Sequence, residues 1–245
     1  TVNEVTYLNE VIGKKVLLEE TGNIAITGFT APKLLWIANQ EPQLFKKISK
    51  IMLPKDYLVY RFTHIFASDV SDLSGTLLFD VKNRTYSKKM LDIVGINEKQ
   101  LPAIHESHEV IGYLTKEMLE ILGLKNDVKV IVGAGDQAAG AVGTGTINHL
   151  DMNIALGTSG VVFVASDTYH VDDVSYLHSF AHANGKYPFM GVTLNAAGSF
   201  QWWRDGFFPE EKFQTLFDAL TSTKIEDTVY YLPYLTGERS PLNDS

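Results

Sequence analysis

The sequence predicts an α/β protein built in two parts. Helical spacing recurs through the first half, while short β-rich runs separated by turn residues follow it. The third observation is the run VIVGAGDQAAG at residues 130–140. Its apolar start is typical of a buried strand, and the small residues after the glycines are typical of a helix start. We therefore expect Asp136 at the carboxyl end of a strand, where open α/β sheets bind ligands.

Most elements of the first half are predicted by helical spacing. A proline stands near the first turn of the first helix, and Gly95 and Gly123 close the last two. In chain order we expect helices at 32–37 and 41–48, a brief strand at 51–53, and helices at 54–62, 87–94 and 115–122.

Turn residues divide the second half into short strands before helical spacing returns. Because this change falls near residue 148, we expect two parts, residues 1–148 and 149–245. The predicted elements are strands at 153–156, 161–165, 176–181 and 188–192, helices at 196–206 and 210–220, and a strand at 228–232.

Composition limits the classes of function. The 245 residues are 45% hydrophobic and include 29 acidic against 21 basic residues, a net charge of −8. A broad basic surface for nucleic acid or an anionic membrane is therefore not expected. The absence of cysteine excludes disulfides and a thiolate nucleophile, and no apolar run is long enough to span a bilayer. We expect a soluble, cytoplasmic protein whose partners are small molecules.

Asp136 is the residue with the clearest chemical role, because a carboxylate at a strand end can accept a proton from a substrate hydroxyl. Two other interpretations compete. Gly133, Gly135 and Ala138 fit a dinucleotide-binding G-x-G-x-x-A pattern. Against this interpretation, the negative charge of Asp136 would face the pyrophosphate. In addition, the acidic residue at the expected distance, Asp151, comes before an apolar run and not at the end of one. Alternatively, the small residues only allow close packing of helix and strand.

A second chemical feature is the turn LGTSG at residues 156–160, between two apolar runs. Exposed backbone N–H groups and two hydroxyls suit a chain of phosphates. An ordinary hairpin turn has the same composition. Asp136 and this turn fall on opposite sides of the predicted boundary, as expected when one part holds the acceptor and the other holds a nucleotide.

Several blocks together resemble the FGGY family of carbohydrate kinases. The segment GFTAPKLLWIANQ at residues 28–40 matches the family's first signature along its whole length. Within the family the blocks are most similar to those of kinases that act on D-xylulose. The other blocks are LPKDYL (53–58), ASDVSD (67–72), SGT (74–76), GDQAAGAVG (135–143), LGTSG (156–160), HSF (178–180) and LPYLTGERSP (232–241).

The resemblance implies an actin/ribonuclease-H-like fold with two domains around a cleft. Residues 1–148 would be the later part of the N-terminal, sugar-binding domain, and residues 149–245 the first part of the C-terminal, nucleotide-binding domain. It further implies ATP and Mg²⁺, with Asp136 as the catalytic base and sugar ligand. Gln137 would be a second sugar contact, and Gly157 and Thr158 would lie beside the nucleotide phosphates. A kinase of gluconate, glycerol or ribulose, and a non-catalytic sugar- or nucleotide-sensing relative, remain as alternatives.

Two family segments are not recognised in these residues: the N-terminal phosphate-loop hairpin and the C-terminal adenine-binding segment. We therefore expect the chain to be an internal fragment that is inactive on its own. Formation of a homodimer is left open.

Three polar side chains in the family blocks have two interpretations each. Asp69 and Asp72 can face the cleft, but the pattern ASDVSD favours a helix cap with a carboxylate in the first turn. Arg239 can contact phosphate, or it can pair with Glu238 or another carboxylate to brace the junction between the two parts.

Histidines and tryptophans of the second half are expected to be structural. His178 and His182 are four residues apart but lie in an extended segment, so polar contacts are favoured over metal ligation, and we assign no metal ligand. Trp202 and Trp203 are expected to pack rather than to bind sugar.

Overall fold

The computed structural model describes residues 1–174, 176–222, 230–232, 234–235, 237–240 and 242. It divides into two compact units. Unit 1 consists of Thr1–Asn153 and Phe163–Met190, and unit 2 of Ile154–Val162 and Gly191–Ser245. The predicted domain boundary between residues 148 and 149 concerns the family's functional domains and stays a prediction.

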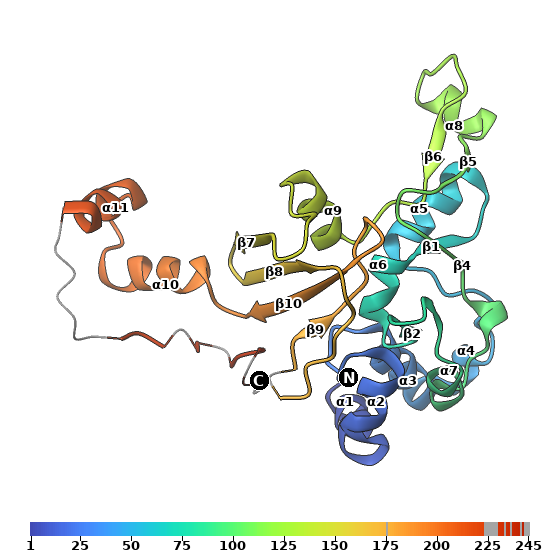
Figure 1. Ribbon diagram of the computed structural model, residues 1–245, viewed down its shortest axis with the longest axis horizontal. Helices are drawn as coiled ribbons and strands as arrows, with labels where there is room; N and C mark the ends of the chain where they lie inside the picture. The colour runs from blue at the N-terminus through green and yellow to red at the C-terminus, as the bar shows by residue number, and fades with distance from the viewer. Residues whose placement is uncertain (175, 223–229, 233, 236, 241, 243–245) are drawn as a thin grey trace. The chain divides into compact units, whose positions relative to one another are not determined.

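The elements up to residue 143 belong to unit 1 and begin with helices (Figure 1). In order they are α1 (Val2–Thr6), the π-helix η1 (Tyr7–Gly13), α2 (Lys14–Thr21), α3 (Thr30–Gln40), α4 (Pro42–Phe45), α5 (Pro54–Thr63), β1 (Ala67–Asp69), α6 (Val70–Leu73), the 3₁₀ turn η2 (Ser74–Thr76), β2 (Phe79–Asp80), β3 (Thr85–Tyr86), α7 (Lys88–Val94), the 3₁₀ turn η3 (Glu98–Gln100), β4 (Ala103–His105), β5 (Val110–Tyr113), α8 (Lys116–Ile121), β6 (Lys129–Ile131) and α9 (Asp136–Gly143).

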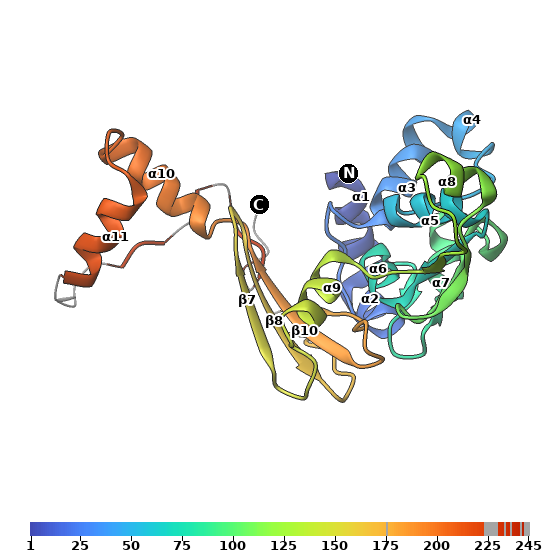
Figure 2. The same ribbon diagram turned by 90° about the horizontal axis from the view of Figure 1, so that it is seen from above.

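The remaining elements begin with strands and end with two helices. They are β7 (Met152–Leu156), β8 (Gly160–Ser166), β9 (His178–Ser179), β10 (Tyr187–Thr193), α10 (Ala197–Phe207) and α11 (Phe213–Ser222). The strands form one sheet in the order β7-β8-β10-β9, and Figure 2 shows β7, β8 and β10 side by side. Phe200 of α10 contacts Phe213 and Phe217 of α11, with ring centroids 5.6 and 5.2 Å apart.

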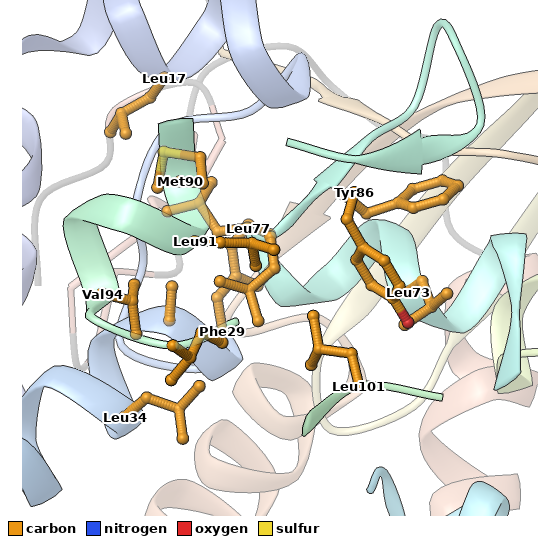
Figure 3. Packing of buried hydrophobic residues seen from close by; sticks show 14 of the residues in the cluster. Leu17, Phe29, Leu34, Leu73, Leu77, Tyr86, Met90, Leu91, Val94 and Leu101 are labelled. Atoms are coloured by element: carbon orange, nitrogen blue, oxygen red, sulfur yellow. The ribbon is translucent and has the colours of Figure 1, made fainter. Parts of the chain in front are cut away.

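Unit 1 has the main hydrophobic core, in which side chains from α2, α3, α6 and α7 meet (Figure 3). Leu17 and Met90 are fully buried in it, and the Phe79 and Tyr86 rings meet edge to face. Helix α7 is fixed at both ends, because the Ser87 hydroxyl accepts the Met90 N–H and its C-cap glycine has φ +80°. The core thus supports α6, which follows directly from β1.

Two short strand pairs lie beside α5 in unit 1. Strands β1 and β4 pair in parallel, with Asp69 opposite His105, whereas β5 and β6 pair antiparallel. The ends of β1 and β6 lead directly into α6 and into the turn before α9. This arrangement brings residues near position 70 and residues near position 135, which are distant in sequence, to one place.

Most of the predicted elements are present. Helices α3, α5, α7 and α8 match the predictions, as do strands β7, β8 and β10 and helix α10. Their signals are local, since a proline stands within the first turn of α5 and Thr115 caps α8 through the Met118 N–H.

Several predictions are wrong. Residues 51–53 form no strand, and helix α4 ends at Phe45. The predicted buried strand before Asp136 is only β6, whose residues Lys129 and Ile131 are exposed because its sole partner in the described sheet is β5. The strand at 176–181 is reduced to β9, and helix α11 begins at Phe213. The strand predicted at 228–232 lies partly outside the described residues.

Three helical segments at the start of the chain were not predicted. Helices α1, η1 and α2 follow one another, and the π-helix between them shifts the helical period that sequence patterns rely on. Asn9 lies in η1, and its side-chain amide exchanges two 3.0 Å hydrogen bonds with the backbone of Ala25. Within the described ranges, no helix has the length and apolarity that a membrane span requires.

Candidate functional site

Asp136 lies at the first turn of α9, at the end of a tight backbone turn. Gly133 has φ +82°, a left-handed conformation that disfavours any side chain. Gly135 is the N-cap residue, and Asp136 follows it with an exposed side chain. Its Oδ1 accepts a 2.8 Å hydrogen bond from the N–H of Gln137, which is half-buried. The carboxylate is also favoured at this position by the helix dipole.

A buried hydroxyl holds the residue that precedes Asp136. The N–H of Gly135 donates a 2.9 Å hydrogen bond to Oγ of Ser71 in α6. The Ser71 hydroxyl donates in turn to Oδ2 of Asp69 at 2.5 Å, and the Ser107 hydroxyl donates to the same oxygen at 2.7 Å. Asp69 is completely buried and caps α6 by accepting the N–H of Ser71. The predicted capping role of Asp69 is therefore confirmed.

Lys55 of α5 compensates the charge of this buried carboxylate. Its Nζ lies 2.9 Å from Oδ1 of Asp69 and 3.3 Å from Oδ1 of Asp56, and it donates a 3.3 Å hydrogen bond to the carbonyl of Val132. Burial opposes its positive charge, but the two carboxylates outweigh burial and raise the pKa of Lys55. One ammonium group thus contacts both the end of β1 and the turn that leads to Asp136.

Asp72, the next residue of α6 after Ser71, also lies beside Gly135. A Cβ built on Gly135 would be 3.4 Å from the Cα of Asp72 and 3.6 Å from its Oδ1, so the two segments are in van der Waals contact. Burial raises the pKa of Asp72 to about 6, against an opposing effect of Lys55. The charges of Asp69, Asp56 and Asp136 raise it further. Asp72 is therefore a carboxyl group whose pKa is raised to about 6, in part by the charge of Asp136.

Sequence reasoning missed Lys55, Ser71 and Ser107 as parts of this site. The only sequence signals were the blocks LPKDYL and ASDVSD, which carry polar residues next to apolar ones. Their contacts join residues 38 positions apart, between Ser107 and Asp69, and 64 positions apart, between Gly135 and Ser71. Only the folded chain brings them together.

Gly157 and Thr158 lie in the exposed turn between β7 and β8, and unit 2 contains both. The start of α10 holds this turn. The N–H groups of Ala196 and Gly198 donate to the Thr158 carbonyl at 2.8 and 3.2 Å, and the N–H of Ala197 donates to the Gly157 carbonyl at 2.9 Å. Asp136 and Gln137 belong to unit 1.

Other polar residues have structural contacts. Nε2 of His182 lies 2.9 Å from the Thr146 carbonyl, and its Nδ1 accepts the Asn184 N–H at 3.3 Å. This pattern requires a neutral ring, and burial lowers the pKa of His182. Glu238 is buried and its Oε1 accepts the N–H groups of Leu194 and Arg239.

The two tryptophans differ in their environment. The Trp203 ring contacts those of Phe200 and Phe208, in agreement with a packing role. Trp202 is half exposed and stacks against Tyr231 at 6.2 Å between ring centroids.

The chain combines a mixed α/β fold with an exposed carboxylate, Asp136, that follows a glycine turn. Comparison with known proteins shows which family has these features. The model of the FGGY family of carbohydrate kinases, N-terminal domain, matches residues 1–143. The chain belongs to the FGGY family of carbohydrate kinases.

Relatives within this family include xylulose kinases. That of Escherichia coli (strain K12) is 40% identical over 225 residues, which are 91% of this chain and 46% of the relative. That of Lactococcus lactis is 38% identical over 247 residues, 100% of this chain and 49% of the relative. The chain thus spans about half the length of the curated relatives it matches.

Solved structures confirm the predicted fold class. A kinase from Brucella ovis, described as a xyloylose kinase, has a TM-score of 0.91 at 39% identity over 99% of this chain and 49% of its own. The gluconate kinase from Lactobacillus acidophilus also has a TM-score of 0.91, at 27% identity over 99% of this chain and 50% of its own. The fold is therefore that of the actin/ribonuclease-H-like FGGY sugar kinases, of which the chain is about half.

Proposed function

We propose that the protein carrying this chain transfers the γ-phosphoryl group of ATP to D-xylulose, giving D-xylulose 5-phosphate and ADP. The observation that carries the proposal is an exposed carboxylate, Asp136, held at a helix start by a buried network, in a chain 35–40% identical to several xylulose kinases. The residues are the later part of the sugar-binding domain (1–148) and the first part of the nucleotide-binding domain (149–245).

The proposed chemistry needs one proton acceptor. The substrate hydroxyl oxygen forms a bond to the γ-phosphorus while the bond from that phosphorus to the β,γ-bridging oxygen breaks. Asp136 takes the hydroxyl proton as the new bond forms. Gln137, the next residue, offers an amide donor and acceptor for a neighbouring sugar hydroxyl.

Gly157 and Thr158 are proposed to contact the nucleotide phosphates, since their turn is exposed and carries a hydroxyl. A divalent metal, normally Mg²⁺, is proposed to accompany ATP, and we assign it no ligand among these residues. When bound, the metal supplies charge neutralisation for the phosphoryl group. The sugar and ATP are thus the proposed partners, and the cytoplasm, where ATP is available, is the proposed location.

A kinase of a different sugar is the second candidate. The observation that favours it is that the gluconate kinase and a xylulose kinase from Lactobacillus acidophilus match this chain equally well, each with a TM-score of 0.91 and 27% identity. The fold that these enzymes share therefore does not distinguish D-xylulose from gluconate as the phosphoryl acceptor.

The test is a coupled assay of ADP release by the intact protein with D-xylulose, gluconate, glycerol and D-ribulose. We expect the highest kcat/KM with D-xylulose. A preference for gluconate would support the second candidate, and ATP binding without turnover of any sugar would support a sensing relative.

Asp136→Asn tests the role of the carboxylate, because it retains the shape of the side chain and removes its basicity. We expect kcat to fall by about 100-fold to 10,000-fold, the usual contribution of a general base, with ATP affinity unchanged in calorimetry. Asp92→Asn, at an exposed position of α7, is the matched control. Turnover of Asp136→Asn at the wild-type rate would exclude Asp136 as the base.

A further inference from the structure

A continuous set of buried contacts leads from Lys55 to the residue before Asp136. Lys55 pairs with Asp69, Asp69 accepts the Ser71 hydroxyl, and Ser71 accepts the N–H of Gly135. Asp69 is completely buried and Ser71 is 4% exposed, so water does not compete for these contacts. All of them lie within unit 1.

The Ser71 hydroxyl has a defined direction. A serine hydroxyl has one proton, and here Oδ2 of Asp69 accepts it. The oxygen therefore presents a lone pair to the N–H of Gly135. The Nζ of Lys55 lies 2.9 Å from the other carboxylate oxygen of Asp69, Oδ1. Reversal of the hydroxyl would leave both the carboxylate and the N–H without this partner.

The same groups also fix the turn from its other side. The Val132 carbonyl accepts a hydrogen bond from Nζ of Lys55, and the N–H of Gly133 donates a hydrogen bond of 3.2 Å to the Ser107 carbonyl. The peptide unit between Val132 and Gly133 is thus tied to α5 through its carbonyl and to the segment after β4 through its N–H. Since Asp136 itself is exposed, its position depends on these contacts of the backbone that precedes it.

We propose that Ser71, Asp69 and Lys55 are positioning residues that hold Asp136 in its reactive place through the N–H of Gly135. The proposal rests on the proposed function for the role of Asp136, but not on the identity of the sugar. Phosphoryl transfer depends strongly on alignment, and a displacement of about 1 Å can cost about 100-fold in rate. Loss of the Ser71 contact should therefore appear in kcat rather than in binding.

The test is Ser71→Ala in the intact protein, with Ser74→Ala as the matched control. Ser74 is also a buried hydroxyl, donates to the Val70 carbonyl at 2.8 Å and accepts the Ala181 N–H at 2.9 Å, so it has the same bonding pattern away from Asp136. We expect Ser71→Ala to lower kcat by about 10-fold to 100-fold with KM for ATP unchanged. An equal effect of both variants on kcat would overturn the proposal.

A double-mutant cycle separates positioning from a general structural effect. If Ser71 acts through Asp136, adding Ser71→Ala to Asp136→Asn should not lower the residual kcat further. Full additivity of the two effects would contradict the proposal. Lys55→Met should reproduce the loss in kcat and Lys55→Arg should restore part of it. Because Lys55→Met leaves two carboxylates uncompensated and can impair folding, Ser71→Ala remains the decisive variant.

Hydrogen exchange provides a readout that does not need turnover. We expect faster exchange at the Gly135 amide in Ser71→Ala and no change there in Ser74→Ala. If the unaltered protein phosphorylates no sugar, the proposed function fails, and exchange at Gly135 still decides whether Ser71 holds the turn. Unchanged protection of Gly135 in Ser71→Ala would overturn the positioning role.

Discussion

The half-buried carboxyl group of Asp72 predicts a stability that depends on pH. Its pKa rises from an ordinary 3.8 to about 6 in the folded chain, chiefly because of burial. The folded state therefore binds a proton that the unfolded state has released between these two values. Stability falls as pH rises through this window, and the full penalty applies above pH 6. Below about pH 3.8 both states are protonated and the penalty is absent.

The magnitude follows from the two pKa values. Their difference, at about 1.4 kcal/mol for each pKa unit, gives about 3 kcal/mol. This figure is an upper bound, because the Asp72 side chain keeps some contact with water. Asp72→Asn removes the ionisable group at nearly constant shape. We expect the variant to gain up to about 3 kcal/mol relative to the unaltered protein at pH 7.5, and almost nothing at pH 4.

Urea unfolding of the intact protein followed by circular dichroism between pH 4 and pH 7.5 measures this difference. Asp92→Asn, on the exposed side of α7, controls for the general effect of removing one negative charge. A gain for Asp72→Asn that is equal at both ends of the pH range would refute the reasoning. So would a loss of stability at pH 7.5, since it would mean that the ionised carboxylate stabilises the fold.

Two further predictions concern the turns of the site. Thr158→Val removes an exposed hydroxyl at nearly constant shape, so we expect weaker apparent affinity for ATP with unchanged sugar affinity, as measured by calorimetry; a selective loss of sugar affinity would contradict the nucleotide role. Gly133→Ala should cost about 1–2 kcal/mol in urea unfolding, because its φ of +82° is left-handed, and should also lower kcat. Gly123→Ala has a similar φ of +66° in open space, so it should lower stability alone, and an equal effect of both variants on kcat would contradict the link to Asp136.

Local sequence signals were sufficient for several helices of unit 1. The serine before α7 and the glycine after it act within one turn of the helix, and so does the proline at the start of α5. The same holds for the Asp69 cap. These interactions form between near neighbours and leave a pattern that can be recognised without the fold.

The strand before Asp136 shows where such reasoning ends. Residues 130–132 are apolar, but only Val132 is buried, because burial depends on which other segments cover a strand. The apolar run therefore predicted a strand correctly and its burial wrongly. Likewise, only the fold shows that the Lys55 ammonium contacts both Asp69 and the Val132 carbonyl.

The close contact between Gly198, at the start of α10, and Thr158 restricts which residues position 198 can accept. A side chain at position 198 would place its Cβ 2.9 Å from the carbonyl oxygen of Thr158, and no replacement at position 158 removes a backbone oxygen. The amides of residues 196–198 are already engaged by the turn, so an anion cannot occupy this helix end without displacing it. Mutational tolerance at position 198 should thus be restricted to glycine for as long as the turn keeps its shape.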